Sequence, residues 1–187
     1  MLSSSLDAAE LRQRNTFSIG VMIALSSWAL IFMTLLWGYV AFRLRAVVWW
    51  QGALTPSAQT IGIINTLIIA ASSWCLSRLR SEHVRRAGQW AWAAFLLGVC
   101  FLAGQSILWQ QLLQHGLHWQ KSAAGGMFFL LTGFHALHIV GGLIAIFLLC
   151  LRHVQWQGTF KMAGIKYFWD FLLAVWLVMF VLIFIVQ

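Results

Sequence analysis

The sequence has very few charged residues. Only 9% of its 187 residues are Asp, Glu, Lys or Arg, four of them acidic, and 61% are hydrophobic. A soluble domain carries roughly 25% charged residues, so this composition excludes one and predicts an integral membrane protein. The formal net charge of +8 could suit nucleic acid. The basic residues, however, lie in short segments between apolar runs, so we predict no nucleic-acid partner.

Catalytic and metal-binding motifs are also missing. The sequence contains no GxSxG, Walker loop, HExxH or glycine-rich dinucleotide turn. Cys75, Cys100 and Cys150 lie in or at the ends of apolar runs without CxxC spacing, which favours small buried hydrophobes over a disulfide or metal site. We therefore predict no catalytic, cofactor-binding or metal-binding residue in this chain.

The sequence does contain five long apolar runs, at about residues 17–42, 60–77, 89–110, 125–151 and 167–186. About 20 helical residues cross a ~30 Å hydrocarbon core, and none of the runs alternates like a β-barrel strand. The predicted fold is all-α, a single membrane domain of five transmembrane helices over residues 17–187. A polar N-terminal tail, residues 1–16, precedes it.

Lysine and arginine are unequally divided between the two ends of these runs. Nine lie in the tail and in the second-to-third and fourth-to-fifth loops, against three on the other side. The positive-inside rule then predicts a cytoplasmic N-terminus and a periplasmic C-terminus. The interfacial tryptophans predicted by this orientation are Trp49, Trp50 and Trp119 outside and Trp90, Trp156 and Trp169 inside.

Two histidines lie deep inside the fourth run. His135 and His138 are three residues apart, which puts them on one helical face, and Gly141 and Gly142 one turn later would admit a neighbouring helix. We interpret the histidines as packing or lipid-contacting groups. Asn65 in the second run and Gln105 in the third are predicted to form hydrogen bonds between helices.

Asp170 is the only acidic residue inside a run, and Lys166 precedes it by one turn. We predict an ion pair between them; the alternatives are a contact with a partner subunit or a place on a surface that takes up protons. Helical rise puts Asp170 about 6 Å and His138 about 20 Å from the same membrane face, which argues against a shared metal site.

Three stretches resemble the haem–copper oxidase subunit III family. TGFHALHIVGG, with His135, His138 and the two glycines, is similar to the family pattern F-H-G-x-H-V-x-x-G. NTLIIAASS, starting at Asn65, resembles N-T-x-x-L-x-x-S-S, and FWDFLLAVWLVMF aligns without gaps with Y-W-H-F-x-D-x-V-W-L-x-x-F. The resemblance covers the chain from about residue 18 onward and is to the short five-helix form of bacterial cytochrome c and quinol oxidases.

This resemblance implies a non-catalytic subunit of a proton-pumping terminal oxidase in a bacterial inner membrane, where it stabilises the catalytic subunit. It implies direct contact with subunit I, subunits II and IV in the same complex, haem and copper in the partners, and bound phospholipid. The candidate lipid-binding or helix-packing residues are His135, His138, Gly141, Gly142, Asn65, Trp169, Asp170 and Trp176.

The chain departs from the family pattern at its carboxylates. Trp28 follows Ser27 where the family usually has an acidic residue, Asp170 stands at the family histidine, and Leu173 stands at the family aspartate. The family associates these groups with proton uptake and bound phospholipid, so we carry over only the structural role. Two alternatives stay open: a related accessory protein of nitric oxide reductase, and a small five-helix transporter or channel.

Overall fold

The computed structural model describes residues 2–45, 54–79, 84–120, 122–156 and 159–185. These ranges hold five long helices and no strand: α1 (Leu2–Arg45), α2 (Pro56–Arg78), α3 (Val84–Gln114), α4 (Ala123–Trp156) and α5 (Phe160–Phe180), with a π-helical turn, η1 (Val181–Ile185), continuing α5. All five helices are long and apolar enough to cross a membrane. The predicted all-α fold with five transmembrane helices is confirmed.

The helix ends follow from the residues found there. The Thr55 hydroxyl accepts a hydrogen bond from the Ala58 amide at 3.3 Å, and Pro56 fills the first turn of α2, where an N–H would have no helical partner. Beyond α3, Gly116 has φ of +89°, a left-handed conformation that glycine adopts readily. That conformation lets the Leu117 amide donate to the Leu112 carbonyl at 2.9 Å and closes the helix.

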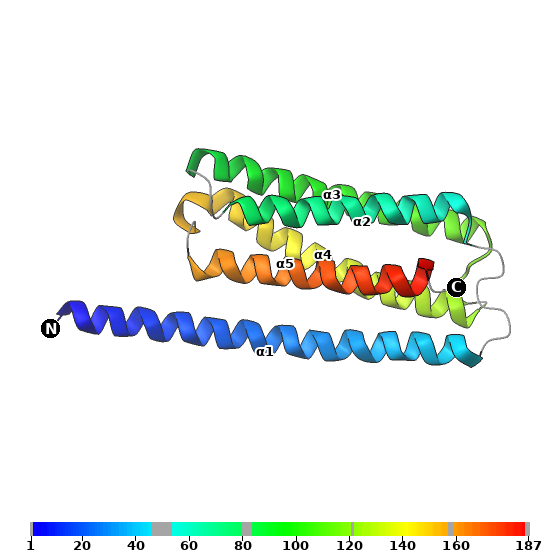
Figure 1. Cartoon of the computed structure of the whole chain (residues 1–187), viewed down its shortest axis with the longest axis horizontal. Coiled ribbons are helices and arrows are strands. Elements are labelled where there is room, and N and C mark those ends of the chain that lie inside the picture. Colours follow the sequence, from blue (N-terminus) through cyan, green and yellow to red (C-terminus); the bar gives the residue numbers. More distant parts are fainter. Residues whose placement is uncertain (1, 46–53, 80–83, 121, 157–158, 186–187) are drawn as a thin grey trace.

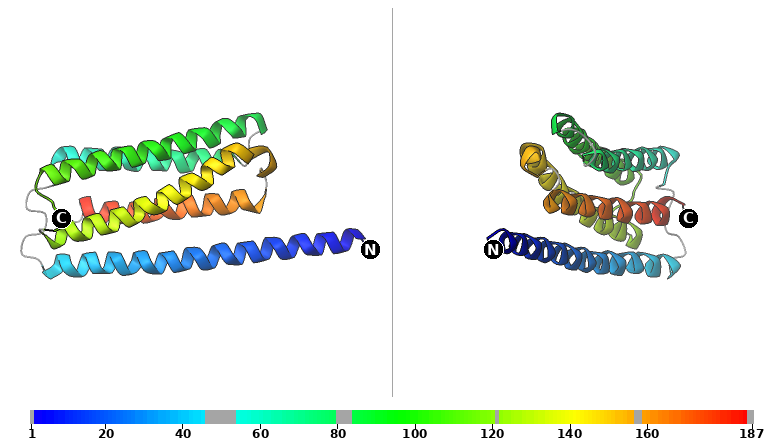
Figure 2. Two further views of the ribbon diagram at one scale, coloured as in Figure 1. Left: turned by 180° about the vertical axis from the view of Figure 1, so that it is seen from behind. Right: turned by 60° about the vertical axis from the view of Figure 1, so that its left-hand side comes forward.

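The helices form layers, with α4 and α5 between the α2–α3 pair and α1. Helix α1 packs against α4 and α5, and Figure 1 and Figure 2 show it on the opposite side of them from α2 and α3. The N-terminus and the C-terminus lie at opposite ends of the bundle (Figure 1). We call these the N end and the C end; α3 and α5 start at the N end, and α2 and α4 start at the C end.

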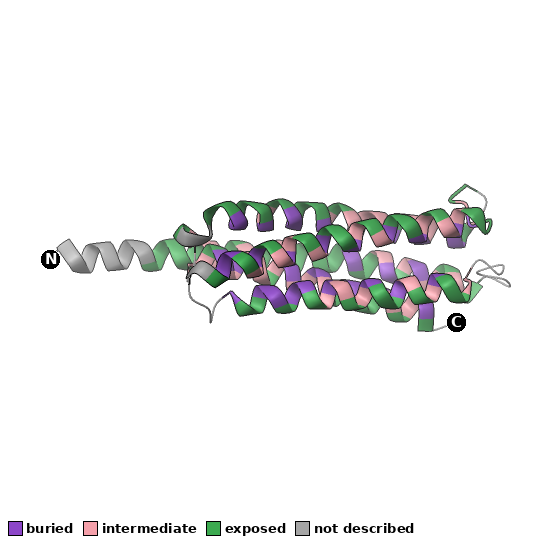
Figure 3. Ribbon diagram, turned by 90° about the horizontal axis from the view of Figure 1, so that it is seen from above, coloured by how far each residue is buried: buried purple, intermediate pink, exposed green. Residues whose placement is uncertain are grey.

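Burial is concentrated between α2, α3, α4 and α5. In the most hydrophobic window of each helix, 33–39% of the residues are buried in these four, but only 11% in α1. Figure 3 shows the buried residues on the inward faces, with exposed residues covering the outside of the bundle. The exposed residues are largely apolar, which fits a surface in contact with lipid or with other membrane helices.

Helix α1 is longer than the first apolar run. Its 44 residues span about 66 Å at ~1.5 Å per residue, about twice a ~30 Å hydrocarbon core. The backbone of residues 2–16, which the sequence predicts as a tail, continues this helix past the others at the N end (Figure 1). Trp49 and Trp50, predicted at the outer interface, lie outside the described residues, as do the loop cations Arg80 and Lys121.

Candidate functional site

The centre of the bundle is built around Trp169 of α5, which is fully buried. Its indole lies between two glycines on neighbouring helices, Gly98 of α3 and Gly142 of α4. A Cβ added at Gly142 would lie 2.8 Å from indole atoms Cε3 and Cζ3, and one at Gly98 would lie 3.0 Å from Cη2. The two glycines therefore allow three helices to meet around one large side chain. Nothing lies within 4 Å of a Cβ added at the exposed Gly141.

His135 of α4 lies among aromatic rings, nearer to the C end than Trp169. It is 1% exposed, and its ring stacks on Trp176 of α5 with centroids 5.8 Å apart and planes inclined by 25°. Phe101 of α3 meets the His135 ring edge-on at 6.2 Å. The Trp176 indole N–H donates to the Thr66 hydroxyl of α2 at 2.9 Å. His135 and Trp176 therefore belong to a contact that joins α2, α3, α4 and α5.

His138 packs against α1. Its ring lies 5.3 Å from the Trp28 ring and 5.4 Å from the Phe32 ring, both on α1. The ring nitrogen Nδ1 is 2.8 Å from the Phe134 carbonyl oxygen, which can only accept, so Nδ1 carries the proton and donates. Phe32 also contacts the His135 ring, at 6.0 Å, so both histidines touch α1, but only His135 also contacts Phe101 and Trp176 of the four-helix core.

Asn65 and Gln105 are both buried in the α2–α3 half of the bundle, at 1% and 2% exposure. The Asn65 side chain lies against Gly104, where an added Cβ would come within 2.1 Å of its Oδ1. Among the described residues, the Asn65 amide nitrogen and both polar atoms of the Gln105 side chain have no hydrogen-bond partner. Asn65 therefore packs closely against α3, but the predicted role of Gln105 as an interhelical donor or acceptor stays a prediction.

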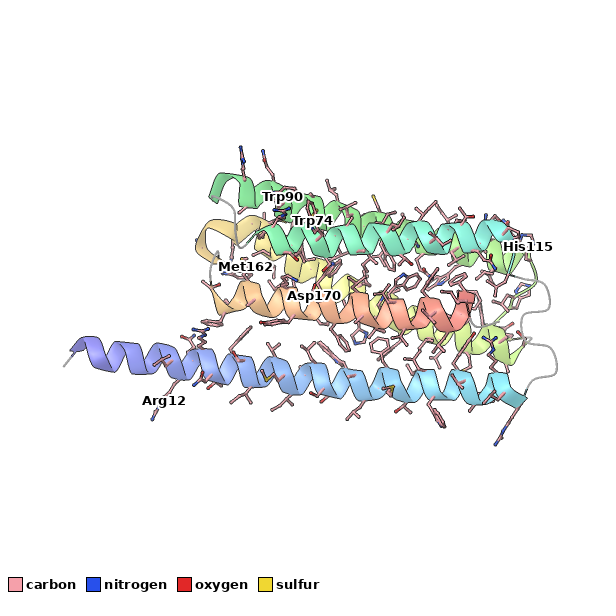
Figure 4. All side chains as sticks on the ribbon, viewed as in Figure 1. Arg12, Trp74, Trp90, His115, Met162 and Asp170 are labelled. Carbon is pink, nitrogen blue, oxygen red and sulfur yellow. The ribbon has the colours of Figure 1, made fainter. Side chains whose placement is uncertain are left out.

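Asp170 follows Trp169 on α5, and its side chain is turned toward α2 (Figure 4). Its carboxylate accepts a hydrogen bond from the Ser73 hydroxyl of α2 and forms an ion pair with Lys166 one turn earlier. The Asp170 side chain is 39% exposed and the Lys166 side chain 31%, so solvent or headgroups screen the pair. No group of three or more His, Cys, Asp or Glu side chains that could hold a metal occurs among the described residues.

A groove of about 360 Å³ lies between α1, α4 and α5 near the N end. Its walls are apolar and include Leu25 and Trp28 of α1, Leu148 of α4 and Phe168 of α5. Trp156 and Lys161 also line it, and the Lys161 ammonium lies 5.6 Å from the centre of the Trp156 ring. The Arg152 guanidinium lies 5.9 Å from the same ring. The groove therefore has apolar walls, and the Lys161 and Arg152 side chains place two positive charges near Trp156.

At the C end, α1 is tied to the end of α5 by polar contacts. Arg43 Nη1 donates to the Leu182 carbonyl at 3.0 Å, and the Tyr39 hydroxyl donates to the same oxygen at 3.5 Å. Leu182 belongs to η1, where the wider π-helical turn changes the usual carbonyl pairing. In the sequence, Arg43 is only one of the three Lys and Arg on the less basic side, because its contact is 139 residues away in the chain.

Two glycines of α3 also escaped sequence reasoning. Gly98 and Gly104 are the close-approach points for Trp169 and Asn65, yet the sequence drew attention only to Gly141 and Gly142. The available signal was only their small size, which Gly88 and five alanines of α3 share. That signal identifies small residues but cannot say which side chain fills the space above each of them.

The fold and the site together define a multi-pass membrane bundle whose interior polar and aromatic groups join helices. A profile of the family described as Cytochrome c oxidase subunit III matches residues 7–187. The chain belongs to the cytochrome c oxidase subunit III family, as its motifs predicted. Family membership and the five membrane-spanning helices make it a multi-pass protein of the bacterial inner membrane and a member of a respiratory oxidase complex.

Curated relatives with the same family name are similar in sequence to nearly the whole chain. The probable cytochrome c oxidase subunit 3 of Mycobacterium tuberculosis (strain H37Rv) is 31% identical over 185 residues, covering 95% of this chain and 91% of the relative. Cytochrome c oxidase subunit 3 of Corynebacterium diphtheriae is 29% identical over 190 residues, with 96% and 92% covered. The protein of the same name from Thermostichus vulcanus is 27% identical over 176 residues, with 89% and 86% covered.

Proposed function

We propose that this chain is the non-catalytic subunit III of a bacterial haem–copper terminal oxidase that reduces O2 with electrons from cytochrome c or quinol. It contacts subunit I directly and shares the complex with subunits II and IV, and the haem and copper are bound in partner subunits. The observation that carries this proposal is the use of the interior polar groups. The side chains of Thr66, Ser73 and Trp176 form hydrogen bonds between α2 and α5 of the same chain, which supports a structural role for them.

The work of such a subunit is to stabilise the catalytic subunit during turnover. Deleting the chain should leave haem content and initial turnover largely intact while shortening the time over which the oxidase stays active. Progress curves of O2 consumption by purified complexes with and without the chain measure both quantities. Loss of haem immediately upon deletion would show instead that the chain is needed to assemble or hold the redox centres.

The groove between α1, α4 and α5 is the proposed phospholipid site. Its apolar walls suit an acyl chain, and Lys161 and Arg152 beside Trp156 suit the phosphate of the headgroup. His138 is the candidate histidine nearest to this site, because it contacts Trp28, which lines the groove. The candidates His135, Asn65, Gly142, Trp169 and Trp176 act in helix packing, and Asp170 with Lys166 fixes the start of α5 against α2.

The lipid proposal is tested by filling the groove. Ala145 lines it, so Ala145→Phe should displace one phospholipid from the intact complex, as counted by native mass spectrometry. Ile144→Phe is the matched control, because Ile144 is 58% exposed and is not among the groove residues. Lys161→Gln should weaken retention of anionic phospholipid more than of zwitterionic phospholipid. Equal lipid content in the Ala145→Phe and Ile144→Phe complexes would argue against this site.

The proposed orientation has the N end in the cytoplasm and the C end in the periplasm. Its support is the excess of nine Lys and Arg over three at the N end, counted from the sequence, including the tail, residues 1–16. An alkaline phosphatase fused after Gln187 should therefore be active, since that enzyme requires the periplasm. Activity only from a fusion in the α2–α3 connection would reverse the assignment.

A further inference from the structure

Gln105 of α3 and His135 of α4 are buried polar side chains on two helices that pack against each other. They are 2% and 1% exposed, and within the described part of the chain neither side-chain atom of Gln105 and neither ring nitrogen of His135 has a hydrogen-bond partner. Buried polar atoms in folded proteins are nearly always paired with protein or with ordered water. Two such groups on adjacent helices therefore call for a common explanation.

The contacts on either side of Gln105 fix its position against α4. One turn before it, the Phe101 ring meets the His135 ring at 6.2 Å, and one turn after it, the Trp109 indole N–H donates to the Thr132 hydroxyl at 3.1 Å. Thr132 and His135 are themselves one turn apart on α4, which runs antiparallel to α3. Gln105 thus lies between these two contacts along α3, about 6 Å of helical rise from each, and is opposite the part of α4 between Thr132 and His135.

The chemistry of the two side chains calls for a small bridging molecule. The Gln105 amide offers an oxygen acceptor and an NH2 donor, and a neutral imidazole offers one donor and one acceptor on opposite sides of its ring. No direct hydrogen bond joins these two described side chains, so a molecule between them is needed to pair an atom of each. Water is both donor and acceptor and is small enough for a buried site between two helices.

The surroundings favour neutral water over an ion. The rings that contact His135 are those of Phe32, Phe101 and Trp176, and among the described residues no hydrogen bond or ion pair joins it to a charged group. We propose that an ordered water molecule in the α3–α4 interface bridges Gln105 and His135 in the middle of the membrane. It links the two helices by polar contacts that lipid cannot replace and so holds their register.

Electron cryomicroscopy of the complete oxidase, at a resolution that resolves ordered water, tests this proposal. The native map should show density within hydrogen-bond distance of both the Gln105 amide and a His135 ring nitrogen. Gln105→Met keeps the length of the side chain and removes its polar atoms, so this density should be lost. Gln110→Met, an exposed position on the same helix, should leave it in place.

A direct Gln105–His135 hydrogen bond in the native map, with no density between the two side chains, would overturn the proposal. Unchanged density in the Gln105→Met complex would overturn it as well, because Gln105 would then not bind the water. If the Gln105→Met variant fails to assemble, the native map alone still shows whether a water molecule lies between Gln105 and His135. A double-mutant cycle supplies an independent test: combining Gln105→Met with His135→Phe should lower the melting temperature less than the two single changes predict together.

Discussion

Gly142 provides the sharpest test of how the bundle is packed. In Gly142→Ala, the added Cβ would lie 2.8 Å from Cε3 and Cζ3 of the Trp169 indole, closer than real Cβ contacts allow. The ring cannot move away freely, because its atoms Cη2 and Cζ2 lie against Gly98 of α3. Overpacking of this kind costs about 1–3 kcal/mol in a well-packed core. Replacing glycine by alanine in a helix is itself favourable by about 1 kcal/mol, so the net effect lies between about zero and a loss of ~2 kcal/mol of stability.

Gly141→Ala is the matched control, since it makes the same chemical change one position away in the same helix. Nothing lies within 4 Å of its added Cβ, so only the favourable helix term applies. The gain from replacing glycine by alanine in a helix is the same in both variants. The difference between their free energies of unfolding therefore measures the cost of the clash alone, about 1–3 kcal/mol, or roughly 5- to 150-fold in the unfolding equilibrium.

The assay is the temperature at which the chain is lost from the purified oxidase, followed by quantitative immunoblotting after a heat step. Gly142→Ala should be lost at a lower temperature than native protein, and Gly141→Ala at the same temperature or a higher one. Adding Trp169→Phe removes the six-membered part of the indole that carries Cε3 and Cζ3 and should recover part of the loss. Equal behaviour of the two glycine variants would refute the packing of Trp169 between α3 and α4.

Three further outcomes follow from the polar contacts. Thr66→Val removes the acceptor of the buried indole N–H and should cost about 1 kcal/mol, measured as a lower melting temperature of the complex. Asp170→Asn should cost less than ~1 kcal/mol, with a difference from native that shrinks at high salt, because its pair with Lys166 is partly exposed; a large loss of activity would instead favour the proton-uptake or partner-contact role. Arg43→Gln should speed hydrogen exchange in residues 182–185 and Arg45→Gln, in an exposed position, should not; equal exchange would show that the carbonyl contact does not hold η1.

The architecture could be predicted from the sequence because each membrane-spanning helix contains a long apolar run that is visible in the sequence. A run of about 20 apolar residues without charge has few folded alternatives in a bilayer, where every backbone group must pair internally. The start of α1 was harder, because residues 2–16 are polar and mixed in charge. A hydropathy pattern locates the part of a helix inside the membrane and does not mark where the helix begins outside it.

The interior contacts were less accessible to sequence reasoning. A spacing of three residues separates His135 and His138 by about 60° around a helix, enough that both touch α1 but only His135 also contacts the four-helix core. Periodicity cannot say which neighbour each meets. The pattern likewise left Gly141 and Gly142 equivalent, although only Gly142 contacts Trp169. These distinctions depend on how helices distant in sequence are placed, which no local pattern contains.

The central claim is that this chain is a redox-inactive subunit of a haem–copper oxidase. Its most direct test is purification in mild detergent through a tag after Gln187, followed by a reduced-minus-oxidised optical spectrum and identification of the co-purifying chains. The account predicts haem a or haem b bands together with a large polytopic partner. A colourless protein that purifies alone would contradict it and would favour a transporter or channel with the same fold.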